Sequence, residues 1–329
     1  MHMSDALISP AVALATGTMA ATLIVVASRE MKKNTREDMV PLMGVMGAFV
    51  FAAQMINFSI PGTGSSGHIV GGVLLAALLG RWAGFLTLCS VIIIQCLVFA
   101  DGGLMALGCN IINMGAMTAL VAYPYVFRPL VKKGISNGRI IWGSVLACVA
   151  GLEAGAACVV FETEISGITA LPWRDFILFM LPIHLVIGIC EGAATAAVLL
   201  FVKRARPDLL GYSEGMRREE KPLKIKGVVI GFAIAALIFG GGLAFLASGD
   251  PDGLEWSIAK VTGSDSLASA DVPVVKSVEE IQHTTAVMPD YDNTLSGVIG
   301  SVIVLALVWV MTSLIVGRCR LKKKYKTPD

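Results

Sequence analysis

Nine apolar segments constrain this chain more than any other feature of its sequence. A membrane-spanning helix needs about 20 mostly apolar residues, and only 15% of the 329 residues are charged, against about 25% in a typical soluble domain. The sequence therefore predicts an all-α integral membrane protein and excludes a soluble enzyme or a disordered chain. The segments are 6–28, 41–58, 68–80, 82–100, 104–127, 139–161, 175–202, 225–247 and 297–317. The third is short for a full crossing, and a stubby helix behind a loop that dips into the protein is the alternative.

The positions of the basic residues predict how the chain is oriented. With the N-terminus outside and nine crossings, 23 of the 26 Lys and Arg residues fall on the inner side, and only Arg174, Lys260 and Lys276 lie outside. This distribution satisfies the positive-inside rule. We therefore expect a multi-pass protein of the cell membrane, in contact with lipid, whose N-terminus is extracytoplasmic and whose C-terminus is cytoplasmic. The net charge of +2 gives no reason to expect a nucleic-acid partner.

A polar stretch divides the chain into two units. Residues 1–205 form a predicted seven-helix bundle, residues 206–224 a cytoplasmic linker, and residues 225–329 a transmembrane hairpin whose two helices are joined by an extracytoplasmic loop over 248–296. The start of the chain lacks a basic region followed by a small-residue cleavage site, so we expect it to be retained rather than removed as a signal peptide. The outer loop has Asp250, Asp252 and Glu255, which either collect cations or shape a turn.

His2 stands where a metal chelate can form at a retained N-terminus. The amine of Met1, the backbone nitrogen between Met1 and His2, and the imidazole of His2 can close two fused rings on one ion. Three nitrogens in a plane need a fourth, and Ni(II) or Cu(II), and less readily Co(II), accept such planar nitrogen ligation. A solvated surface histidine is the alternative interpretation.

A second histidine follows a glycine- and serine-rich loop. His68 ends the stretch NFSIPGTGSSGH, residues 57–68, and glycines allow tight backbone paths there. We expect the loop to fold into the mouth of the bundle and to present His68 to the chelate, with Asn57, Ser65 and Ser66 orienting the ligands around it. An ordinary flexible loop is the alternative.

Two ionisable residues lie deeper in the seventh segment. His184 and Glu191 are seven residues apart, which places both on one face of a helix. Groups at such depth are costly and normally face the interior with a partner, so they form either a polar relay or a structural lock between helices. Asp101 is expected at an outer turn, and Asn110 and Asn113 in helix capping or hydrogen bonds between helices.

Two sequence motifs of enzymes and pumps are absent. The chain has no GxxxxGK[ST], so it does not bind ATP by a P-loop, and no HExxH, the commonest zinc-protease signature. A pump built on this chain must therefore draw its energy from a partner or from an ion gradient.

Together, Met1-His2, the 57–68 loop, QCLVFADGGLMALGCNIINMG (95–115) and HLVIGICEG (184–192) resemble the CbiM/NikM family. Its members are substrate-capture (S) subunits of energy-coupling-factor transporters for cobalt and nickel. The resemblance covers about residues 1–205; the following hairpin, with Pro-Asp-Gly-Leu-Glu at 251–255, resembles the accessory N subunit of the PDGLE type. The resemblance implies that Met1, His2 and His68 hold the ion. Many members continue with Met-His-Ile-x-Asp/Glu-Gly, whereas this chain has Met-Ser-Asp-Ala at 3–6, and no family role falls on His283.

The resemblance implies capture of Ni(II) or Co(II) outside the cell and ATP-driven delivery inward. It implies two partners, a transmembrane coupling subunit and a cytoplasmic ATP-binding cassette ATPase, and no cofactor other than the transported ion. The fused hairpin is expected to assist metal loading. The alternative is a proton-coupled secondary transporter that uses Glu191 and His184 as its relay. A metalloenzyme is disfavoured, because a planar site leaves no open position beside a general base.

Overall fold

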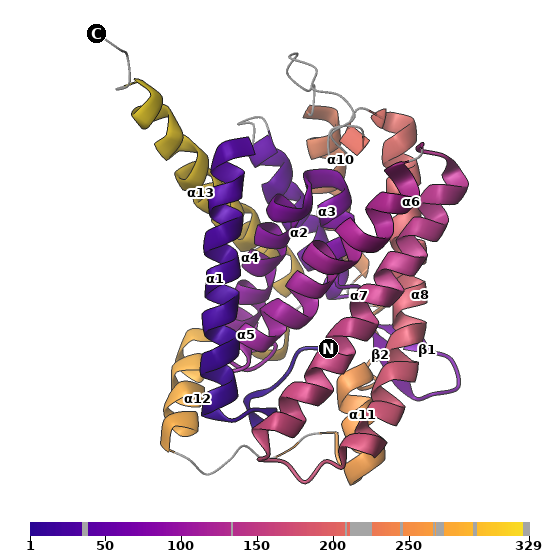
Figure 1. Ribbon diagram of the computed structural model, residues 1–329, viewed down its shortest axis with the longest axis vertical. Helices are drawn as coiled ribbons and strands as arrows, with labels where there is room; N and C mark the ends of the chain where they lie inside the picture. The colour runs from indigo at the N-terminus through magenta and orange to yellow at the C-terminus, as the bar shows by residue number, and fades with distance from the viewer. Residues whose placement is uncertain are drawn as a thin grey trace.

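The structure is helical apart from one small hairpin (Figure 1). It is a computed structural model, and it describes residues 1–34, 39–132, 134–207, 209–210, 226–243, 246–265, 267, 273–291 and 295–324. The fold-class prediction of an all-α membrane protein is confirmed.

Six helical stretches within the described residues are long and apolar enough to cross a membrane. They are α1 (Pro10–Asn34), α4 (Arg81–Phe99), α7 (Asn137–Ser166), α8 (Trp173–Ala205), α10 (Lys226–Ile238) with η4 (Phe239–Leu243), and α13 (Ser296–Lys324). Another apolar helix, α2 (Val40–Gln54), has 15 residues and is almost entirely buried.

Two of the predicted apolar segments have a different form from a simple spanning helix. The third contains α3 (Gly72–Leu79), whose eight residues are all buried; at 1.5 Å per residue they cover about 12 Å, too little to cross a core about 30 Å thick. The fifth begins with α5 (Leu107–Asn110) and continues as η3 (Ile111–Phe127), a π-type helix that contains Pro124, before α6 (Arg128–Lys132).

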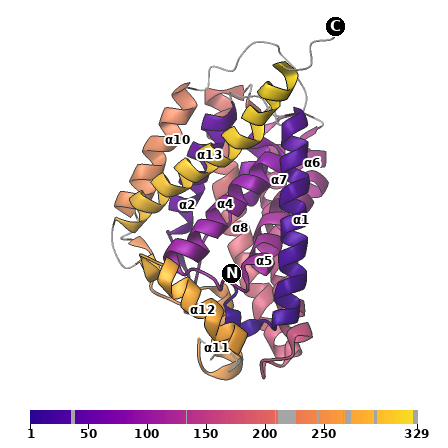
Figure 2. The same cartoon turned by 90° about the vertical axis from the view of Figure 1, so that its left-hand side faces the viewer.

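Small residues allow close packing inside the bundle. A side-chain carbon added at Gly192 would lie 2.4 Å from the Cα of Val145, and one added at Gly188 would lie 2.9 Å from the Cα of Val149. Gly188 and Gly192, four residues apart, therefore let α8 pack closely against α7. In the second unit, α10 and α13 pack on α2, and the hydroxyl of Ser301 bonds the carbonyl of Ala48. Figure 2 shows α10 and α13 along this side of the bundle.

Much of the connection over 248–296, predicted as an outer loop without further detail, is helical. It contains α11 (Gly253–Thr262), α12 (Pro273–Thr285) and the short η6 (Pro289–Tyr291). A capping box between Asp252 and Glu255 starts α11, and Gly263 ends it with a positive φ of 81°. His283, expected in a loop, lies in the last turn of α12.

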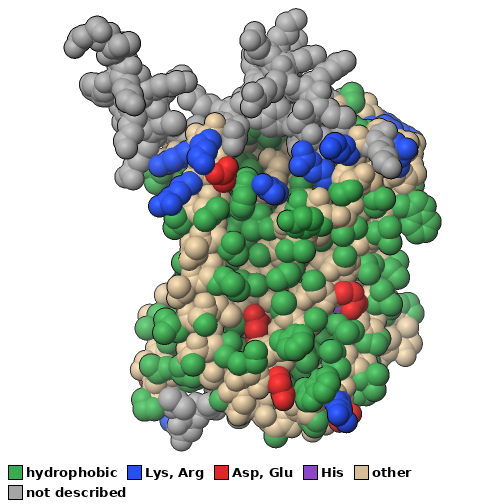
Figure 3. Space-filling view, viewed as in Figure 1, with side chains coloured by type: hydrophobic (Ala, Val, Ile, Leu, Met, Phe, Trp, Pro, Cys, Tyr) green, Lys and Arg blue, Asp and Glu red, His purple; other side chains and the backbone are tan. Residues whose placement is uncertain are grey.

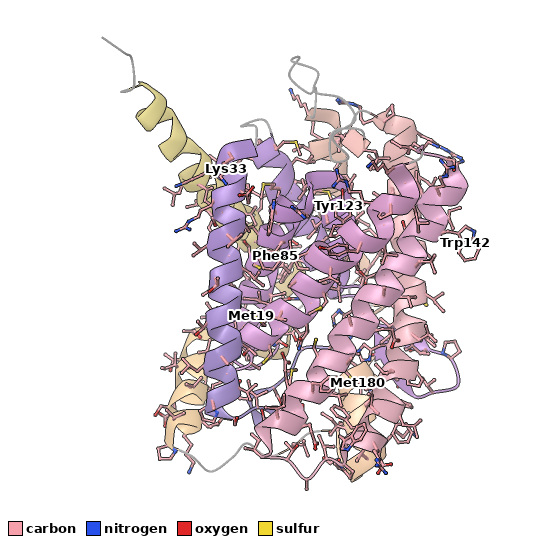
Figure 4. The ribbon with its side chains drawn as sticks, viewed as in Figure 1. Met19, Lys33, Phe85, Tyr123, Trp142 and Met180 are labelled. Atoms are coloured by element: carbon pink, nitrogen blue, oxygen red, sulfur yellow. The ribbon has the colours of Figure 1, made fainter. Side chains whose placement is uncertain are left out.

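The 57–68 loop also has regular structure. Strands β1 (Phe58–Ile60) and β2 (Ser65–Gly67) pair antiparallel, with Phe58 opposite Gly67. This hairpin, α11 and α12 lie toward the end of the bundle opposite Lys33, which is labelled at the end of α1 in Figure 4. Figure 3 shows most Lys and Arg side chains of the visible face at the Lys33 end, above a broad hydrophobic band.

Candidate metal site

The N-terminal segment enters the bundle before α1 begins (Figure 1). Met1 is 4% exposed and Met3 is fully buried. Asn110 holds Met3 from both sides: its carbonyl oxygen accepts from the Met3 N–H at 2.8 Å, and its amide donates to the Met3 carbonyl at 3.2 Å. The N–H of Gly103 donates to the same carbonyl at 2.8 Å. These bonds fix the path of the first residues, and after them η1 (Asp5–Leu7) turns the chain toward α1.

The terminal amine of Met1 is bound by the second unit. It lies 2.5 Å from Oδ2 of Asp252, while Oδ1 of Asp252 accepts from the N–H groups of Leu254 and Glu255 at the start of α11. A side-chain carbon at the next residue, Gly253, would lie 2.9 Å from Ile187 and 3.1 Å from His184. The absence of a side chain there lets the start of α11 approach α8 and reach the N-terminus.

His2 is held by a chain of polar groups from both units. Its Nδ1 lies 3.1 Å from Oδ1 of Asp101, and the Tyr291 hydroxyl donates to Oδ2 of Asp101 at 2.7 Å. Tyr291 stacks on Phe99 with ring centroids 4.7 Å apart. The Nε2 of His2 is buried without a hydrogen-bond partner among the described residues.

His68 is brought beside His2 by the turn between β2 and α3. The carboxylate of Glu191 accepts from the N–H groups of Val70 and Gly71 at 2.8 and 2.9 Å, which ties this turn to α8. Nδ1 of His68 bonds the carbonyl of Ile69 at 3.1 Å, leaving Nε2 for another partner. The rings of His2 and His68 stack with centroids 5.3 Å apart. Their nitrogen lone pairs therefore lie in separate, nearly parallel planes, so binding of one ion by both rings requires a side-chain rotation.

Burial sets the charge states of these groups. It lowers the pKa of His68 to about 4, with further lowering by the terminal ammonium and His2. Burial likewise lowers the pKa of His2, against the opposing charge of Asp101. Burial alone would raise the pKa of Asp252, but the terminal ammonium and His68 outweigh it and hold that pKa well below its usual range. At neutral pH both imidazoles are therefore neutral, the form that binds metals.

The other predicted residues lie around these groups. The hydroxyl of Ser66 donates to the Asp250 carbonyl at 2.7 Å, and its N–H donates to the Pro251 carbonyl. The hydroxyl of Ser65 bonds the carbonyls of Ser66 and Pro251. These serines join the β hairpin to the second unit. Asn57 accepts a backbone hydrogen bond from Ser248.

His184 lies close to Met1 and His68. It forms no hydrogen bond or ion pair with Glu191, whose carboxylate accepts from Val70 and Gly71. Nδ1 of His184 bonds the carbonyl of Met180, labelled in Figure 4, at 2.7 Å. Its Nε2 has no hydrogen-bond partner among the described residues. A cavity of about 10 Å³ is lined by Met1, His68, His184 and Asp252, which is room for about one water molecule.

A larger cavity of about 470 Å³ opens beside the nitrogen donors. We call it the mouth cavity. Its lining includes His2, His68 and Asn57. It also includes five carboxyl groups from both units, namely Asp5, Asp101, Asp252, Glu255 and Glu279.

Several residues of this site escape prediction from sequence. Asn110 was expected only to cap or to join helices, and it holds the N-terminal segment. No local sequence pattern indicates that Asp101 and Tyr291 meet at His2, because the two residues are 190 positions apart. Among the described residues, no three His, Cys, Asp or Glu side chains gather closely enough to hold an ion. The donor set of the predicted chelate instead depends on the terminal amine and a backbone nitrogen.

The long apolar helices and the buried polar site at one end of the bundle define a multi-pass membrane protein of the transporter class. Residues 2–209 match the family described as the cobalt uptake substrate-specific transmembrane region, and residues 226–317 match the PDGLE domain. The chain belongs to this cobalt uptake family, the nickel and cobalt transport proteins of the CbiM and NikMN type, and has a PDGLE domain after the family region.

Two of the similar proteins are named as fused nickel transport proteins. A protein of Archaeoglobus fulgidus named as a fused nickel transport protein, NikMN, is 32% identical over 314 residues, 95% of this chain and 98% of its own length. One of Lactiplantibacillus plantarum named as a fused nickel transport protein, LarMN, is 33% identical over 78% of each chain. A crystal structure of a transition metal transporter superposes with a TM-score of 0.56 at 27% identity, over 66% of this chain and all of that one. The predicted family resemblance is confirmed.

Proposed function

We propose that this protein captures Ni(II) or Co(II) at the end of the bundle that holds its N-terminus and delivers the ion across the membrane. One observation carries the proposal: the imidazoles of His2 and His68, which are far apart in sequence, stack at a cavity lined by carboxylates, and one of these carboxylates, Asp252, binds the buried amine of Met1. The names of the relatives, nickel and cobalt transport proteins, support this cargo.

The proposed ligands are four nitrogens. The amine of Met1, the backbone nitrogen of His2 and Nδ1 of His2 form the two fused rings, and Nε2 of His68 supplies the fourth position. A planar set of this kind suits Ni(II), whereas Zn(II) prefers tetrahedral ligands and Mg(II) prefers oxygen. In the present structure the amine is held by Asp252 and Nδ1 of His2 by Asp101. Loading therefore requires the ion to replace both carboxylates, as well as the ring rotation described above.

We further propose that the site faces outside and that two partners drive transport. The Lys and Arg side chains near Lys33 suit the cytoplasmic side, which supports an N-terminus outside and a C-terminus inside. A transmembrane coupling subunit and an ATP-binding cassette ATPase would supply the energy, because the sequence has no P-loop. In proteoliposomes containing both partners, nickel uptake should follow ATP hydrolysis and persist when a protonophore removes the proton gradient. Uptake that stops with the gradient would instead favour the proton-coupled alternative.

The Glu191→Gln substitution separates these two mechanisms. A glutamine offers one acceptor oxygen to two N–H groups, so we expect the turn that positions His68 to loosen and nickel affinity to fall about tenfold, the size typical of partners that orient a metal ligand. Calorimetry measures this fall. If Glu191 is a proton relay instead, affinity stays unchanged and only gradient-driven uptake is lost.

The Asp252→Asn substitution tests the bond between the two units. Asparagine still caps α11, but it leaves the buried ammonium of Met1 without an opposite charge. Loss of one partner of a buried ion pair typically costs about 3–5 kcal/mol, so we expect thermal unfolding at a lower temperature. Saturating nickel should narrow the difference from the wild type, because the ion then takes the amine. Asp250→Asn, at an exposed neighbour whose side chain bonds Ser59 and Ser248, is the matched control and should unfold like the wild type.

A further inference from the structure

We propose that the mouth cavity is a second cation site, which holds a divalent metal ion together with its water shell before the ion reaches the nitrogen donors. The inference rests on the proposed function, since it places this site on the path to the chelate. It assigns a role to two carboxylates that neither hold the N-terminus nor orient a histidine, Asp5 and Glu279.

Asp5 has a carboxylate oxygen that lacks a hydrogen-bond partner among the described residues. It is 4% exposed, and its Oδ1 accepts from the N–H of Ala106 at 2.9 Å. Its Oδ2 is buried and has no hydrogen-bond partner among the described residues, although Asp5 lines the mouth cavity. A buried carboxylate oxygen without a partner is costly. A cation in the cavity would remove that cost.

Glu279 adds a second carboxylate to the lining of the mouth cavity. It lies on α12, in the second unit, and it is close enough to Asp5 to reinforce the rise in the pKa of Asp5 that burial causes. Neither carboxylate has an ion-pair partner in the described part of the chain. None of the described residues that line the cavity is Lys or Arg. Among the described residues, the two units therefore enclose a space rich in carboxylates and without a lining Lys or Arg, and such a space concentrates cations.

The dimensions of the cavity favour a hydrated ion over a bare one. No three acidic, histidine or cysteine side chains in the described residues are close enough to bind a bare ion directly. The cavity volume of about 470 Å³ leaves room for an ion and several waters, each of which takes about 30 Å³. Small divalent ions give up water reluctantly and often bind carboxylates through it. Exchange of this water for nitrogen ligands would then take place at Met1 and His2.

Hexaamminecobalt(III) is a suitable probe, because it has the size and shape of a hydrated metal ion and does not exchange its ligands. It can occupy the mouth cavity but cannot enter the chelate. With the full chain in lipid nanodiscs at low ionic strength, we expect calorimetry to show one hexaamminecobalt(III) bound, and stopped-flow absorbance to show that it slows nickel association. Asp5→Asn and Glu279→Gln should each weaken probe binding and slow nickel association about threefold, and together about tenfold. The ligand-field absorption band of bound nickel should not change.

Glu280→Gln is the matched control, because Glu280 is the exposed neighbour of Glu279 on α12 and does not line the cavity. It should behave as the wild type. The proposal is overturned if hexaamminecobalt(III) does not bind, or if the control weakens binding as much as Glu279→Gln. Failure of the chelate is a different result: the probe would still bind with the same dependence on Asp5 and Glu279, while nickel binding would not depend on His2 and His68.

Discussion

A peptide of several residues, without histidine, added before Met1 is expected to lower nickel affinity more than about 100-fold. The added peptide converts the amine of Met1 into an amide and moves the free amine several residues away from His2, which removes one proposed ligand and breaks the chelate ring that it closes. Residues that only orient a metal ligand already contribute about 10–100-fold to affinity, so loss of a ligand should cost more. The structure adds a steric reason, because Met1 is 4% exposed and its nitrogen lies 2.5 Å from Asp252. Calorimetry with Ni(II) and Co(II) measures the change.

The control is restoration of the native end in the same protein. If the added residues end in a protease site that leaves nothing behind, cleavage should return the affinity to that of the untagged chain, and mass spectrometry of the intact protein shows which form is present. The same peptide added at the C-terminus should have no effect. Tight nickel binding by the uncleaved protein would place the site elsewhere, and His184 would then be the first residue to test.

The bundle was predictable because apolar length and charge position determine which segments enter a membrane. The short third segment was recognised for the same reason, since residues 68–80 hold only a brief apolar run. The two helices in the 248–296 stretch could not be predicted from a long apolar run, because they contain none. Helix α12 is amphipathic, and only its Val275 and Gln282 are buried. Such a helix depends on the surface that it covers. Here Gln282 donates to the carbonyls of Cys96 and Gly102, contacts that no local pattern contains.

The residues of the site also fall into two groups, those that the sequence predicts and those that depend on tertiary packing. Met1 and His2 could be proposed because a chelate at the N-terminus uses those nitrogens, and His68 because of the glycine-rich loop before it and the family resemblance. In the structure the rings of His2 and His68 stack. The residues that hold the N-terminal segment in place could not be proposed from the sequence, because they act through tertiary contacts. Asp252 meets the N-terminus across 251 positions, and Asn110 meets Met3 across 107. The capping motif at 252–255 predicts a helix start, but its use as an anchor for the amine depends on how the second unit packs on the first.

His2→Ala and His68→Ala are each expected to lower nickel affinity by at least about 100-fold, because each removes a direct ligand in the proposed set. The two residues also stack on each other, so an alanine at either position removes packing as well as a nitrogen. His68→Phe separates the two effects, since phenylalanine keeps an aromatic ring against His2 but has no lone pair. Affinity should fall as far in His68→Phe as in His68→Ala, while the thermal stability of the metal-free protein should be closer to the wild type.

His283→Ala is the control for a histidine that faces solvent at the end of α12, and it should bind nickel as the wild type does. His184→Ala should have a smaller effect than either His2→Ala or His68→Ala, because Nδ1 of His184 is committed to the Met180 carbonyl and the residue only borders the small cavity beside Met1. Nickel binding that survives His2→Ala and His68→Phe but fails in His184→Ala would contradict the chelate and move the site to α8. If nickel binding is lost only in His2→Ala and His68→Phe, in proteins with the native N-terminus, the result would support the terminal amine and the two stacked imidazoles as ligands of the ion.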